Sequence, residues 1–305
     1  MAFGLEALPI IALILVGVGL RAGGLVDRRS GLALARVVYH TTIPAAIFTS
    51  IARSRLTAEM GLLTALGFGL PCLLAGVMFL TTRRLKDRPA SRGVLLAGMV
   101  VLGVFGYPFI SLFYGPEGLA RMAMYDVGNS LYAGSVALVL ARTFGARCAD
   151  EGACGVPWGK VVTSPILLAA VLGVGVSLLG WEPPAFVGSF LDLLARANTP
   201  LAMMAVGVFV RPRRGQLGLV LQYVSIRMAL GGLLAWSIAL LAGLNGLDLV
   251  VAVTASSLPA GTTALVYASN EGLDAELAAA IISTTVILGA LLINLVPLLL
   301  GGLYL

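Results

Sequence analysis

The chain has 305 residues, of which 59% are hydrophobic and 11% are charged, and it carries a formal net charge of +6 at pH 7. This apolar fraction exceeds what the core of one soluble domain can bury, so the composition excludes an ordinary globular protein. It predicts a chain that is surrounded by the lipid bilayer.

Apolar runs, divided by charged clusters and turn residues, follow one another along the chain. A membrane-spanning helix takes about 20 residues, so there is room for roughly ten spans and no extramembrane domain. The expected spans are 7–22, 34–52, 60–82, 94–114, 119–141, 161–180, 186–210, 215–242, 247–269 and 277–300. The predicted fold class is therefore an all-α integral membrane protein with ten transmembrane helices.

Basic residues are concentrated in alternate loops. Fifteen lysines and arginines lie in one set of loops, whereas the other set holds Arg53, Arg55 and Arg121. Because cytoplasmic loops collect basic residues, this bias predicts a multi-pass plasma-membrane protein with both termini outside. The net positive charge follows from this topology, and no nucleic acid partner is needed to explain it.

Two apolar segments, Gly106–Phe109 and Ser257–Gly261, are interrupted by proline at matching places in the two halves. A proline inside a membrane helix lacks the N–H group and frees a carbonyl one turn earlier. Either Pro108 or Pro259 alone could be a simple kink. As a pair, they predict broken helices four and nine, which in transporters mark a substrate site near the bilayer midplane.

The two halves also match in their second spans, which contain Pro44 and Pro200. Pro44 precedes Pro108 by 64 residues, and Pro200 precedes Pro259 by 59. This spacing predicts two five-helix repeats, residues 1–145 and 161–305, joined by a cytoplasmic loop at 146–160. Because five is odd, the second repeat is inverted, which is the usual basis of alternating access. The alternative is a chance likeness between apolar segments.

Several motifs resemble those of the auxin efflux carrier family of secondary transporters. They are Gly103–Pro108 (GVFGYP), Phe113–Leu119 (FYGPEGL), Tyr125–Asn129 (YDVGN), Pro200–Gly207 (PLAMMAVG) and Pro259–Thr263 (PAGTT), and the likeness runs nearly end to end. The resemblance implies the fold of bile-acid/sodium symporters, with a scaffold domain and a transport domain in which broken helices four and nine cross. It also implies transport of small organic anions, including indole acids and dicarboxylates.

Two positions depart from the family pattern. Members often carry asparagine a few residues before the first crossover proline and just after the second, where this chain has Val101 and Thr263. Those amides would contact substrate, so the departures suggest a different cargo from that of well-known relatives.

The crossing of two broken helices suits an anion, because half-helix N-termini present free N–H groups and the positive end of the helix dipole. We therefore expect the backbone to do most of the binding, with glycines allowing close approach and threonines donating hydroxyls. The predicted substrate contacts are Gly106, Tyr107, Pro108, Asn129, Pro259, Ala260, Gly261, Thr262 and Thr263.

Ionisable residues inside spans are functional candidates, because charge is costly in lipid. Asp126 lies three residues before Asn129 on one helical face and is the candidate for proton coupling, although it could instead pair with Arg121 near the surface. Asp192 and Arg196 are four apart and are interpreted as a self-neutralised pair. Arg227 has no partner that the sequence identifies.

Other chemistries find little support. His40 is the only histidine, the three cysteines (Cys72, Cys148 and Cys154) cannot all pair, and no nucleotide-binding loop is present, so we expect no metal, no cofactor and no ATP-driven transport. The expected partners are a small organic anion and the lipid bilayer, and proton coupling and a homodimer are compatible with this interpretation. A sodium-coupled symporter of the bile-acid type, a membrane enzyme and a non-transporting receptor remain as alternatives; the expected function is not enzymatic.

Overall fold

The computed structural model describes residues 8–53, 57–145, 163, 165–209 and 216–304. Regular structure in these ranges is helical throughout, without strands, which confirms the all-α prediction. Two of the described helices, Ala58–Thr81 and Leu217–Leu241, are long and apolar enough to cross a membrane. The count of ten spans and the inverted repeat remain predictions. The expected loop at 146–160, with Cys148 and Cys154, lies outside the described residues.

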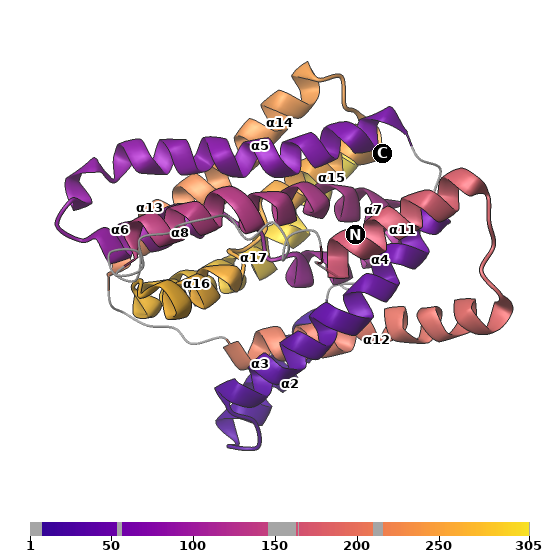
Figure 1. The fold of residues 1–305 in the computed structure, drawn as a ribbon, viewed down its shortest axis with the longest axis horizontal. Helices are drawn as coiled ribbons and strands as arrows, with labels where there is room; N and C mark the ends of the chain where they lie inside the picture. The colour runs from indigo at the N-terminus through magenta and orange to yellow at the C-terminus, as the bar shows by residue number, and fades with distance from the viewer. Residues whose placement is uncertain (1–7, 54–56, 146–162, 164, 210–215, 305) are drawn as a thin grey trace.

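One group of helices, which we call the panel bundle, combines the N-terminal helices with two from the middle of the chain (Figure 1). Its members are α2 (Leu8–Ala22), α3 (Arg28–Val37), the π-helical turn η1 (Val38–Thr42), α4 (Ile43–Ala52), α11 (Pro165–Leu179) and α12 (Ala185–Phe209). Helix α12 packs on α2, α3 and α4, and α11 packs on α4. The panel bundle therefore draws on both predicted repeats.

The second group, the crossover bundle, holds the remaining helices (Figure 1). Its members are α5 (Ala58–Thr81), η2 (Arg83–Leu85), α6 (Pro89–Ala97), α7 (Gly103–Tyr132), η3 (Ala133–Ala137), α8 (Leu138–Phe144), α13 (Leu217–Val224), η4 (Ser225–Leu230), α14 (Gly231–Leu241), α15 (Gly246–Ser256), α16 (Thr263–Glu271) and α17 (Ala275–Tyr304). Helix α7 packs on α5 and α15, and also contacts α4, α11 and α12 of the panel bundle. It thus links the two bundles.

Helix α7 bends sharply at Gly115, whose φ of +60° favours a residue without a side chain. Pro116 follows and begins a new helical direction. The bend divides α7 into segments at 103–114 and 116–132, and so lies where the sequence predicts the boundary between two spans.

Each bundle contains a pair of helices in backbone contact through glycines. Gly17 of α2 meets Gly207 of α12, and Gly67 of α5 meets the turn of α7 that carries Gly128. A Cβ atom on any of these four glycines would lie 2.0–2.2 Å from a carbonyl oxygen of the partner helix. Small residues allow such close packing of helices in membranes, where the hydrophobic effect between helices is weak.

The chain is interrupted at Gly98–Leu102, between α6 and α7, and again at residues 257–262, between α15 and α16. The two breaks cross and pair through their backbones. Leu102 N–H donates to Pro259 O at 2.9 Å, and Gly261 N–H donates to Val100 O at 2.7 Å. The expectation that two broken segments cross is therefore met.

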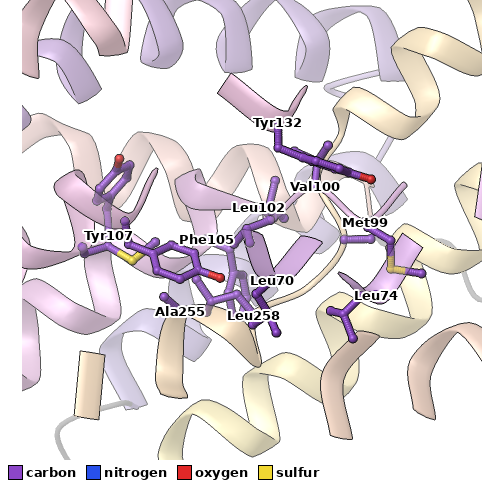
Figure 2. Close-up of a cluster of buried hydrophobic side chains, with 14 of the residues drawn as sticks. Leu70, Leu74, Met99, Val100, Leu102, Phe105, Tyr107, Tyr132, Ala255 and Leu258 are labelled. Carbon is purple, nitrogen blue, oxygen red and sulfur yellow. The ribbon is translucent and has the colours of Figure 1, made fainter. Parts of the chain in front are cut away.

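The position of the first break differs from the expected one. Pro108 lies inside α7, six residues after the break ends, whereas Pro259 lies within the second break. The pairing with the second break satisfies backbone groups between Val100 and Leu102, so no proline is needed there to end the helix. Side chains of both breaks pack with Leu70 and Leu74 of α5 in a buried apolar cluster (Figure 2).

Candidate functional site

The crossing has four helix ends, and its two carbonyl ends are closed by side chains. At the end of α6, the Tyr223 hydroxyl donates to Gly98 O and the Tyr132 hydroxyl donates to Leu96 O. At the end of α15, Arg227 Nη1 donates to Ser256 O at 2.6 Å. The carbonyls of Leu96, Gly98 and Ser256, which could otherwise attract a cation, thus already have protein donors.

The two amide ends of the crossing are different. The N-cap positions of α7 and α16 are Leu102 and Thr262, and neither makes a side-chain capping hydrogen bond. The first turn of each helix also lacks an acidic residue. A helix N-terminus carries partial positive charge and favours a negatively charged partner. The start of α7 already lies beside one, since a Cβ atom on Gly103 would be 2.8 Å from Asp126 Oδ2. The start of α16 is therefore the end that favours an anion from outside the chain.

A buried hydrogen-bonded chain joins Asp126 to the first break. The Asp126 carboxylate accepts a hydrogen bond from the Tyr107 hydroxyl and another from Asn129 Nδ2, both at 2.7 Å. Asn129 Oδ1 in turn accepts from the Val101 N–H at 2.9 Å. A change in the charge of Asp126 can therefore affect the crossing through the side chain of Asn129.

The alternative partner for Asp126 finds no support, because Asp126 is only 3% exposed and Arg121 pairs with Asp248 at 3.0 Å. The predicted pairing of Asp192 with Arg196 is wrong. Asp192 instead forms its ion pair with Arg53, which caps the end of α4 in the same bundle, at 3.0 Å.

The predicted contacts from the first half lie just beyond the break. Gly106, Tyr107 and Pro108 are buried in the first two turns of α7. A Cβ atom on Gly106 would lie 2.3 Å from the Leu258 side chain, so this glycine allows the second break to approach α7. The Tyr107 hydroxyl is held by Asp126.

The predicted contacts from the second half differ in what they can still bind. Pro259, Ala260 and Gly261 are buried within the break, and the Ala260 N–H donates to Thr285 Oγ1 at 3.2 Å. The Gly261 N–H is also used, in the bond to the first break. The start of α16 is therefore more available for binding a ligand than the break itself. Thr262 and Thr263 are half-buried there.

Comparison with known proteins identifies the family of this chain. A family model described as membrane transport protein matches residues 154–297. An uncharacterized transporter from Methanothermobacter thermautotrophicus is 30% identical over 290 residues, which cover 92% of this chain and 93% of the relative. The chain belongs to this membrane transport protein family.

Shorter matches connect the transporter with named carriers. A probable auxin efflux carrier component 1b from Oryza sativa subsp. japonica is 30% identical over 143 residues, covering 44% of this chain and 25% of that protein. A putative malonate transporter from Rhizobium meliloti is 29% identical over 132 residues, covering 42% of this chain and 41% of the relative. The family predicted from the motifs is confirmed.

Sequence reasoning missed the side chains that close the helix ends of this transporter. Tyr132, Tyr223 and Thr285 are ordinary residues in apolar runs, and nothing local distinguishes them. Arg227 is visible as a lone basic residue in the expected eighth span, but its partner Ser256 lies 29 residues away. Only the fold brings these groups to the crossing.

Proposed function

We propose that this transporter is a secondary carrier that moves a small organic anion, with a carboxylate group, by alternating access around the crossed breaks. The observation that supports this proposal is the asymmetry of the crossing. Its carbonyl ends already have donors, whereas its amide end at Thr262 has neither a side-chain cap nor an acidic residue in the first turn. Amide ends of broken helices are the places where transporters hold anionic groups.

The amide ends can account for part of the binding. A negative charge at a helix N-terminus gains about 0.3–1 kcal/mol in exposed sites and up to about 2 kcal/mol in partly buried ones. The start of α16, with the hydroxyls of Thr262 and Thr263 beside it, can hold a carboxylate without an arginine at that position. The name of the putative malonate transporter makes malonate the first compound to test.

We assign proton coupling to Asp126 within this proposal. Its carboxylate is linked through Asn129 to the first break, so its charge acts on the site that holds the anion. Protonation removes a like charge from this region, and proton binding and anion binding therefore favour each other. A sodium-coupled mechanism is less well supported, since the carbonyls at the ends of α6 and α15 are already bonded to side chains.

The proposal includes two inverted five-helix repeats, with both termini outside the plasma membrane. Each half of the chain supplies one of the two crossing breaks, which supports the repeat, and the distribution of basic residues supports the orientation. In a variant that keeps Cys154 as the only cysteine, a membrane-impermeant thiol reagent should label opened cells and spare intact ones. Rapid labelling of intact cells would reverse the orientation.

Ligand-induced stabilisation of the purified protein tests the substrate class. A ligand at about one hundred times its Kd stabilises the native state by about 2.7 kcal/mol, which raises the unfolding midpoint of a chain of this size by a few degrees. We expect malonate or another small carboxylate to produce this rise, and the neutral malonamide to produce none. A panel of mono- and dicarboxylates that leaves the midpoint unchanged would reject the proposal.

A further inference from the structure

Arg227 is a buried charge whose position is fixed at the second break. It lies on the π-helical turn η4 and is 1% exposed. Its Nη1 atom donates to Ser256 O, the carbonyl at the end of α15. Beside this carbonyl, the Ser256 hydroxyl lies 3.1 Å from the Tyr125 hydroxyl. The guanidinium is therefore anchored by one nitrogen, and its remaining donors face the interior.

Those remaining donors, Nε and Nη2, are buried and have no hydrogen-bond partner. They form one edge of the planar guanidinium, with two parallel N–H groups that match the two oxygens of a carboxylate. None of the ion pairs found among the described residues involves Arg227. A complete carboxylate-binding edge is thus enclosed without an acceptor.

Arg92 shows that the chain can satisfy a buried arginine when its role is structural. The Arg92 guanidinium donates to Thr82 Oγ1 and to Phe79 O, and it lies over the rings of Phe79 and Phe144 at 4.3 and 5.2 Å. Arg227 lacks such a set of partners on its Nε–Nη2 edge. Leaving charged donors buried and unpaired is strongly unfavourable, so an acceptor from outside the chain is expected during the transport cycle.

We propose that the Nε–Nη2 edge of Arg227 binds a carboxylate group of the transported anion. This inference rests on the proposed function and adds a second recognition point to it. Arg227 holds the Ser256 end of the second break, and the uncapped amide end at Thr262 is six residues further along. A cargo with two carboxylates can use both points, and it binds more tightly than a monocarboxylate of the same length.

Calorimetric titration with malonate and propionate, which have the same number of carbon atoms, tests this assignment. Arg227→Gln removes the charge, while Arg227→Lys keeps the charge but lacks the two-donor edge. Arg92→Lys is the matched control, because its partners all lie within the protein. We expect Arg227→Gln to weaken malonate binding about 10- to 100-fold and to abolish the preference over propionate. Arg227→Lys should fall between Arg227→Gln and the wild type, and Arg92→Lys should match the wild type.

The outcomes separate this assignment from the proposed function. If the wild type binds carboxylates and both folded Arg227 variants bind malonate within about twofold of it, Arg227 is not a recognition residue. An equal loss in Arg92→Lys would assign the effect to packing and would also overturn the inference. If the wild type binds no carboxylate at all, the proposed function fails and this assignment fails with it.

Discussion

The panel bundle and the crossover bundle differ in the polar groups that they bury. In the panel bundle, a neutral hydrogen bond from the Thr42 hydroxyl to Asn198 Oδ1, at 3.1 Å, joins buried polar side chains of different helices. Among the described residues of the crossover bundle, three charged side chains are buried: Arg92, Asp126 and Arg227. Both bundles pack helices through a glycine pair, so they differ in charge rather than in packing.

Under the proposed function, this difference separates support from transport. Charged groups inside the membrane are costly. Asp126 and Arg227 have the proposed roles in coupling and recognition, whereas Arg92 is held by partners within the protein. A neutral hydrogen bond joins helices at little cost. We therefore expect changes in the panel bundle to alter stability, and changes at the crossing to alter binding and flux.

The largest effect is expected from the glycine contacts. Gly67→Val places a side chain against a carbonyl of α7 and should reduce the yield of folded protein severely, by overpacking that costs about 1–3 kcal/mol or more. Gly69→Val, on the same helix in open space, is the control and should fold normally. Size-exclusion profiles and unfolding midpoints check this, and normal folding of Gly67→Val would refute the close contact.

Substitution of the two prolines tests the role of the breaks in transport. Pro259→Ala allows helix formation through the second break and should reduce flux in proteoliposomes by up to about 100-fold, because small misplacements of binding groups are costly. Pro108→Ala, inside α7, should change flux much less. Folded yield should be similar for both variants. Equal, large losses of flux in both variants would show that Pro108 matters to the crossing as much as Pro259 does. Normal flux in both variants would show that the prolines only kink their helices.

Asp126 should control the dependence of binding on pH. We expect the affinity of the wild type for the anion to strengthen as pH falls, since protonation removes a like charge, and the effect should be about tenfold. Asp126→Asn should bind the anion and lose most of this dependence. Asp192→Asn, at the surface ion pair of the panel bundle, should keep it. Titration of each protein with the anion at several pH values checks this. If Asp126→Asn keeps the full pH dependence of the wild type, Asp126 is not the coupling group.

The smallest effect is expected in the panel bundle. Thr42→Val removes the hydrogen bond to Asn198 and should lower stability by about 1 kcal/mol, the size of a typical interhelical bond. Flux per folded molecule should stay at the wild-type level. A loss of flux without a loss of stability would show that the panel bundle takes part in recognition.

Local signals predicted much of the fold. The apolar composition predicted a helical chain, Pro259 located the second break, and the spacing of Asp126 and Asn129 placed both on one face. The first break could not be placed in this way, because it is stabilised by backbone pairing with residues about 160 positions later. The partner of Asp192 was missed for the same reason, since Arg53 lies 139 residues away.

Counterflow in sodium-free proteoliposomes is the most direct test of the central claim that the crossing carries an organic anion. Vesicles preloaded with the carboxylate that gives the largest thermal stabilisation should accumulate its labelled form, and only when they contain the protein. Stabilisation without exchange would make the protein a receptor, and exchange that requires sodium would contradict the assignment of coupling to Asp126.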